Sequence, residues 1–122
     1  DHGSIYVDML KMHRGWTLAI DDDGTTLQPE KFSLGNNYPN PFNPSTTIDF
    51  SVPVQSGVTF TIYNVLGEEM YRMSNDNLTS GVYRVRWNGK NKYGVQVPSG
   101  IYFYQLEAGE SFRQTKKMTL IK

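Results

Sequence analysis

The side chains that could do chemistry are few and lie near the start of the chain. His2 and His13 are the only histidines of the 122 residues, and Asp8 lies between them. Histidine and an acid are the materials of a Ser-His-Asp centre or of a metal site. Their spacing here matches neither kind of motif, and without cysteine there is no thiolate catalysis, disulfide or Cys-based zinc site. The sequence therefore predicts a protein that is not an enzyme and has no cofactor.

A run of carboxylates, Asp21-Asp22-Asp23-Gly24, is the second group with chemical potential. Calcium takes several such oxygens, but an EF-hand loop places acidic residues at alternate positions and adds a distal Glu. This run does neither. We interpret it as part of a polar linker and predict no metal site, with calcium binding to the run left open.

Composition narrows the classes of partner. Twelve basic residues balance twelve acidic ones, so neither nucleic acid nor an anionic membrane surface is expected as the main partner. Hydrophobic residues make up 38% of the chain, enough for one modest core, and no run approaches the ~18 apolar residues of a spanning helix. No signal-peptide pattern follows Asp1, so we expect a mature protein or a fragment.

The elements that must position any site are predicted to be strands. Eight Tyr, six Phe and two Trp, with eleven Gly and six Pro, are typical of short strands joined by turns. Alternating segments occupy 47–52, 57–63, 68–73, 82–87, 100–107 and 111–121, with Asn75-Asp76-Asn77 expected as a break. About seven strands at intervals of roughly 8–12 residues predict an all-β fold, an immunoglobulin-like antiparallel β-sandwich over Phe32–Lys122.

Strand alternation also predicts which side chains form the core. These are Ile48, Phe50, Val58, Phe60, Ile62, Tyr83, Val85, Trp87, Ile101, Phe103, Met118 and Leu120. The cysteine pair that marks antibody domains is missing, so the prediction concerns the architecture and not that family.

Residues 1–31 are predicted to be a separate strand segment and linker. Apolar residues alternate or cluster in Ser4–Met12 and Trp16–Ile20, and the candidates for strand pairing are Ile5, Val7, Met9, Trp16, Leu18 and Ile20. Two interpretations stay open. The segment is either the end of an upstream domain or a strand donated to the sheet edge of an identical subunit.

A proline-rich loop leads into the predicted sandwich. Three prolines alternate with other residues in Tyr38-Pro39-Asn40-Pro41-Phe42-Asn43-Pro44, which removes three backbone donors and excludes regular sheet or helix. Tyr38 and Phe42 are available to fix the loop onto a core. We name Tyr38–Pro44 the Asn-Pro loop and treat it as a candidate functional surface.

Several blocks in fixed order resemble a known family. They are Leu34-Gly35-Asn36-Asn37 with the Asn-Pro loop and Ser45-Thr46-Thr47-Ile48, then Ile62-Tyr63-Asn64-Val65-Leu66-Gly67, Gly81-Val82-Tyr83, Trp87-Asn88-Gly89, Pro98-Ser99-Gly100-Ile101-Tyr102-Phe103-Tyr104, and the terminal Lys117-Met118-Thr119-Leu120-Ile121-Lys122. Together they resemble the C-terminal sorting domain of the bacterial type IX secretion system, which is similar to the Ig-like domain of flagellar hook-capping proteins.

The resemblance implies a role in export. Domains of that family end large secreted cargo, are recognised by the outer-membrane secretion machinery and are commonly cleaved during attachment to the cell surface. A secreted or surface location, reached through the periplasm, is implied here. The implied export signal is Lys116, Lys117, Met118, Thr119, Leu120, Ile121 and Lys122. Without the resemblance, the same residues describe an ordinary last strand. Only a short segment precedes the resembling part, where the family has a large cargo region.

Two other functions stay open. The chain could be a structural subunit of a secreted filament that assembles head to tail by donating the strand in Ser4–Ile20. It could also be a carbohydrate-binding module in which Tyr71, Tyr93 or Tyr102 stacks on sugar rings.

Overall fold

The computed structural model describes residues 4–8, 16–21 and 29–121, and strands are the only regular elements in these ranges. They are β1 (Ser4–Asp8), β2 (Trp16–Asp21), β3 (Ser33–Leu34), β4 (Thr46–Val52), β5 (Ser56–Asn64), β6 (Glu69–Leu78), β7 (Gly81–Trp87), β8 (Gly100–Ala108) and β9 (Phe112–Leu120). No described residues form a helix long and apolar enough to cross a membrane.

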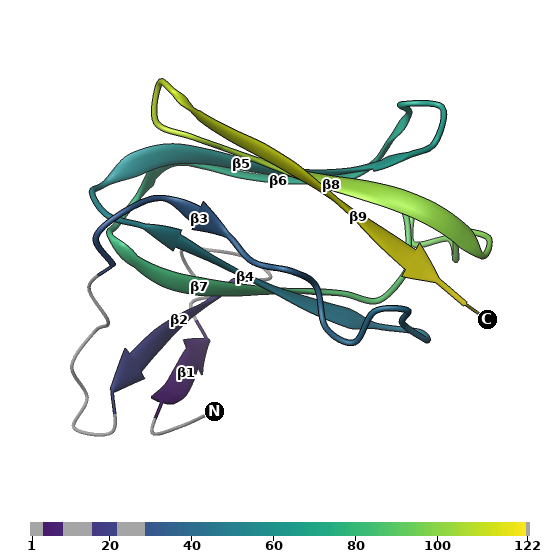
Figure 1. Cartoon of the computed structure of the whole chain (residues 1–122), viewed down its shortest axis with the longest axis horizontal. Coiled ribbons are helices and arrows are strands. Elements are labelled where there is room, and N and C mark those ends of the chain that lie inside the picture. The colour runs from purple at the N-terminus through teal and green to yellow at the C-terminus, as the bar shows by residue number, and fades with distance from the viewer. Residues whose placement is uncertain (1–3, 9–15, 22–28, 122) are drawn as a thin grey trace.

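Two antiparallel sheets face each other (Figure 1). One has the strand order β1-β2-β7-β4-β3 and the other β6-β5-β8-β9. The seven strands β3 to β9 build the sandwich, which confirms the predicted all-β, immunoglobulin-like fold.

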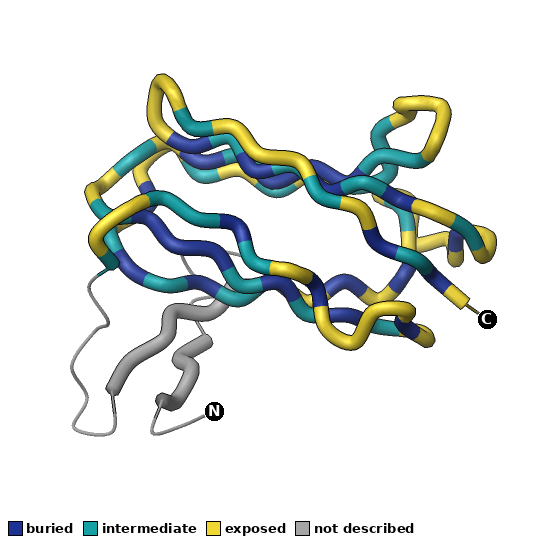
Figure 2. The backbone as a smooth tube through the Cα atoms, viewed as in Figure 1, coloured by how far each residue is buried: buried dark blue, intermediate teal, exposed yellow. Residues whose placement is uncertain are grey.

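The predicted alternation places β4, β5, β7 and β9 correctly. Their buried apolar residues are Ile48, Phe50, Val52, Val58, Phe60, Ile62, Tyr83, Val85, Trp87, Met118 and Leu120. In Figure 2, buried positions (dark blue) recur along the strands of both sheets. The intervening positions point to the outer faces of the sheets, because successive side chains of a strand point to opposite faces. Most of them are at least partly exposed, whereas Ser51 and Thr61 are buried. The two rows of apolar side chains meet in a single core cluster.

The predicted face of β8 was wrong. Ile101 is 41% exposed and Phe103 is only half-buried, whereas Tyr102, Tyr104 and Leu106 are buried. This strand is apolar and aromatic on both faces, so its own pattern does not distinguish them. Pairing decides the face, because Ile62 of β5 lies opposite Tyr104 and directly opposite residues share a face.

The predicted break at Asn75-Asp76-Asn77 was also wrong. These residues lie inside β6, which continues to the buried Leu78. Because β6 is an edge strand, polar side chains on it reach solvent easily, and Asp76 and Asn77 are exposed. The pairing of β6 with β5 includes two register shifts, which accommodate the extra length.

The N-terminal strands extend the first sheet. β2 pairs with β7, with Trp16 opposite Val85 and Leu18 opposite Tyr83, and β1 pairs with β2. Of the candidate pairing residues, Ile5 and Val7 lie in β1 and Trp16, Leu18 and Ile20 in β2, while Met9 lies outside the described residues. His2, His13, Asp22 and Asp23 also lie outside them.

Candidate functional site at the terminal strand

The terminal strand β9 forms one edge of the four-stranded sheet. It pairs with β8 along its full length, from Phe112 opposite Ala108 to Leu120 opposite Gly100. Met118 and Leu120 are buried, whereas the side chains of Arg113, Thr115 and Lys117 are exposed. The strand is therefore anchored by its last apolar residues and open to solvent along its outer face.

The Asn-Pro loop lies against the outer edge of β9. Phe42 N donates a hydrogen bond to Thr119 O (2.9 Å), and Ile121 N donates one to Phe42 O (2.9 Å). Phe42 and Leu120 form a short parallel bridge, and Thr119 N donates to Asn40 Oδ1 at 3.1 Å. The two segments that the sequence marked as candidate surfaces, 79 residues apart between Asn40 and Thr119, thus form one structural unit.

Phe42 holds the loop in the core. Phe42 is 1% exposed, and its ring centroid lies 5.7 Å from that of Trp87. The rings of Trp87 and Tyr102 pack in a T-shaped arrangement with centroids 5.5 Å apart. Trp87 Nε1 donates a hydrogen bond to Lys90 O (2.8 Å). Tyr38, the other aromatic residue of the loop, lies at the surface. It is 44% exposed, and its hydroxyl donates to Asp49 Oδ2 at 3.0 Å.

Polar contacts from β8 fix the chain that leads into the loop. The Tyr104 hydroxyl donates to Gly35 O (2.8 Å) and accepts a hydrogen bond from Asn37 N (2.9 Å). Asn37 Nδ2 donates to Thr46 Oγ1 and to Pro39 O. Gly35 passes so near β4 that a Cβ there would lie 2.9 Å from Asp49 O, which explains why glycine is needed.

Asn37 and Tyr104 belong to the blocks that resemble the family, but the sequence pattern predicted no structural role for either of them. The periodic pattern of β8 could not assign Tyr104 to the core, and nothing distinguished Asn37 from the other asparagines of the loop. One signal was available in the sequence. A tyrosine in an apolar strand indicates a hydrogen bond to another segment, because its hydroxyl usually has a partner when the side chain is buried.

Positive charge gathers on β9. The strand carries Arg113, Lys116 and Lys117 and no acidic residue. Arg113 Nη2 pairs with Glu107 Oε2 of β8 at 2.8 Å. Lys116 Nζ donates to the neutral Asn36 Oδ1 at 3.0 Å, and the Lys117 side chain extends into solvent. Two of the three basic side chains therefore have no acidic partner among the described residues.

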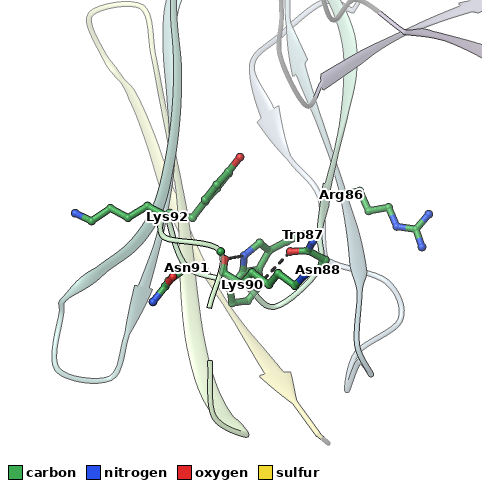
Figure 3. A pocket seen from close by; sticks show the side chains of 8 residues that line it. Arg86, Trp87, Asn88, Lys90, Asn91 and Lys92 are labelled. Carbon is green, nitrogen blue, oxygen red and sulfur yellow. Dashed lines mark hydrogen bonds between the residues drawn. The ribbon is translucent and has the colours of Figure 1, made fainter. Parts of the chain in front are cut away.

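A cleft of about 530 Å³ among the described residues is lined by Tyr71, Arg86, Trp87, Asn88, Lys90, Asn91, Lys92 and Gly94. The charged ends of Arg86 and Lys92 point in opposite directions away from it (Figure 3). Within residues 29–121 and the two N-terminal strands, no group of three or more potential ligands could hold a metal ion.

Tyr102 cannot stack on a sugar ring, so its prediction as a sugar-stacking residue was wrong. It is buried at 3% exposure beside Trp87, because its position on β8 faces the core. Tyr71 packs partly against the core, and Tyr93 is 78% exposed. Of the three aromatic residues, Tyr93 is the one that is largely exposed, and Lys92 Nζ lies 5.7 Å from the centroid of its ring.

Alkaline pH is expected to weaken the fold through buried tyrosines. Burial raises the pKa of Tyr83, Tyr102 and Tyr104 above the ordinary value of 10.0, because the phenolate would lose its hydration. As pH rises, the unfolded chain releases the tyrosine protons before the folded chain does. The stability that these protonated tyrosines contribute is therefore complete below the ordinary pKa of 10.0 and is lost as pH rises through the pKa values of the folded state. Urea denaturation from about pH 8 to about pH 12 should show a falling free energy of unfolding above about pH 10. A level profile would contradict the expectation.

Known structures share this architecture at low sequence identity. Dimeric latent PorU from Porphyromonas gingivalis is 16% identical, with 87% of this chain matched to 12% of PorU and a TM-score of 0.59. PorZ, a surface component of the type IX secretion system of the same organism, is 20% identical, with 88% of this chain matched to 15% of PorZ and a TM-score of 0.52. FlgD from P. aeruginosa is 20% identical over 62% of this chain and 61% of FlgD, with a TM-score of 0.50.

These likenesses support the fold, and the chain spans only a small part of PorU and PorZ. No curated protein matches the chain. Family membership rests on the sequence, because the family model described as "Secretion system C-terminal sorting domain" matches residues 36–122. That segment contains the Asn-Pro loop and the terminal strand, and it ends at the last residue. The chain belongs to the family of secretion system C-terminal sorting domains, as its resemblance to the type IX domain indicated.

Proposed function

We propose that this chain is a non-catalytic sorting module that directs export through the type IX secretion system and attachment to the cell surface. The observation that carries the proposal is the unit formed by β9 and the Asn-Pro loop. Its backbone contacts join Phe42 to Thr119 and Ile121. This unit places an exposed strand that carries basic residues at the edge of the sandwich. Binding surfaces are often formed in this way, by an exposed segment that a folded scaffold holds in position. The partner is the outer-membrane secretion machinery, and the route leads through the periplasm.

Residues 116–122 are proposed as the part of the module that is recognised. Their buried members, Met118 and Leu120, hold the strand in place, and their exposed members, Lys117 and Ile121, are available to a partner. We further propose that residues 32–122 are the sorting domain and that residues 1–31 end an upstream domain or link to it.

Export of a reporter protein tests this function. A reporter fused ahead of residues 1–122 is expected in the medium or on the surface of a bacterium with a type IX system. Removing Lys116–Lys122 should reduce its export by at least about tenfold, measured by fractionation and immunoblot. Equal export with and without these residues would contradict the sorting role.

The truncation also removes Met118 and Leu120 from the core, so it needs a matched control. The double variant Lys117→Gln and Ile121→Ser changes exposed side chains alone and should leave the melting temperature within a few degrees. Reduced export of this folded variant would assign the loss to recognition. Phe60→Ala, which weakens the core without altering residues 116–122, shows what instability alone does.

Self-assembly by strand donation stays the alternative. It requires β2 to leave β7 of its own chain, with which it pairs here, and to pair with β7 of a neighbour. Electron microscopy and light scattering of the chain, intact and without residues 1–24, separate the two functions. Filaments that vanish on truncation would favour the structural subunit.

A further inference from the structure

The outer edge of β9 is only partly covered. In a strand, the N–H and C=O of one residue point to the same side, and those of the next point to the other side. Thr119 N and Thr119 O both bond to the Asn-Pro loop, so Thr119 points away from β8. By alternation, the backbone groups of Lys117, Thr115 and Arg113 point to the same outer side. Among the described residues, no backbone hydrogen bond engages these groups on that side.

The open stretch has the dimensions of a strand-binding site. Three residues with outward N–H and C=O groups alternate over Arg113–Lys117, and this pattern pairs with an extended segment of about five residues. The loop contact at Thr119 closes one end of the edge, and this closure limits the register of an added strand. Main-chain hydrogen bonds would supply the binding and the flanking side chains the selectivity.

The basic residues of β9 determine which kind of strand could pair with the open edge. Arg113, Lys116 and Lys117 lie on β9 with no acid on the strand, and Glu107 neutralises Arg113 alone. A second copy that added its own β9 would place cations opposite cations, and like charges directly opposite destabilise a strand pair. An extended segment with acidic side chains would instead face Lys116 and Lys117. Edge lysines of this kind also discourage indiscriminate pairing with neutral strands.

We propose that the Arg113–Lys117 edge accepts an extended acidic segment of the secretion machinery by β-strand addition. The proposal rests on the sorting function proposed above and gives its mode of recognition. The edge then works together with the Asn-Pro loop, which hydrogen-bonds to Thr119 and Ile121 just beyond it.

Proline at position 115 tests the proposal directly. Thr115 N–H points outward, so Thr115→Pro removes one donor of the open edge while the backbone hydrogen bonds to β8 stay intact. The variant is introduced into the full chain behind the export reporter. We expect export to fall at least about tenfold relative to Thr115→Val, the matched control. The control keeps the N–H but, like proline, lacks the hydroxyl that accepts a hydrogen bond from Gln105 Nε2.

The outcomes separate the inference from the proposed function. If the unaltered chain does not export the reporter, the sorting function itself fails. If the unaltered chain is exported and folded Thr115→Pro is exported equally well, strand addition at this edge is wrong. Should Thr115→Pro fail to fold, Lys117→Glu, which alters an exposed side chain, decides with the same expected loss against Lys117→Arg, which keeps the positive charge. Light scattering that shows oligomers abolished by Thr115→Pro would assign the edge to a second copy and overturn the proposal.

Discussion

Replacing Trp87 by alanine is expected to lower the free energy of unfolding by about 3–5 kcal/mol, a large share of the stability of a small domain. The side chain is 2% exposed and lies between Phe42 of the Asn-Pro loop and Tyr102 of β8. Its removal leaves a cavity where the loop meets the sandwich, and it also leaves Lys90 O without the indole donor. Urea denaturation followed by circular dichroism measures the loss.

Trp87→Phe is the matched control. It keeps an aromatic ring between Phe42 and Tyr102 but removes the hydrogen bond to Lys90 O, so about 1–2 kcal/mol is expected. The difference between the two variants reports the packing alone. A loss below about 1 kcal/mol for Trp87→Ala would show that this ring does not fix the loop. Amide exchange of Thr119 and Ile121, which bond to the loop, should accelerate in the alanine variant.

Removing one hydroxyl, in Tyr104→Phe, is expected to cost about 2–4 kcal/mol. The group joins β8 to the start of the Asn-Pro loop by two hydrogen bonds, from its own proton to Gly35 O and from Asn37 N. Phenylalanine fills the same space, so the packing changes little. A partly buried carbonyl and a buried N–H lose their partner together, and each carries some of the penalty of an unsatisfied polar group.

Tyr102→Phe provides the comparison for this variant. Tyr102 lies on the same face of β8 and donates one hydrogen bond, to Pro98 O, four residues away. We expect a loss of about 1 kcal/mol there. Equal losses for the two variants would contradict the idea that the Tyr104 hydroxyl organises the loop. Thermal unfolding of both proteins beside the unaltered chain provides the measurement.

The terminal strand has two roles that place different demands on its residues. Met118 and Leu120 belong to the core, so changes at these positions affect folding and recognition together. Arg113, Thr115 and Lys117 face solvent, so they can be altered with small effects on stability. Variants at the exposed positions therefore give the cleaner tests of recognition.

Much of the sandwich follows from local sequence. In β4, β5 and β7, polar residues alternate with apolar ones, because one face of each strand contacts solvent and the other the core. The family was also accessible, because its blocks are contiguous stretches that include the Asn-Pro loop and the terminal residues. The local pattern could not orient β8, whose two faces are both apolar, or mark the end of the polar edge strand β6.

The sequence by itself determined the fold class, the core of the alternating strands and the two segments that carry the candidate function. Only the tertiary structure decided that these segments touch, that β2 pairs with β7, and that Tyr104 joins β8 to the loop. The physical reason is that the sequence pattern is local, whereas these contacts join residues far apart in the sequence. Alternation records whether each side chain meets solvent or core, whereas contacts between residues tens of positions apart depend on strand order and register, which the whole chain fixes on folding.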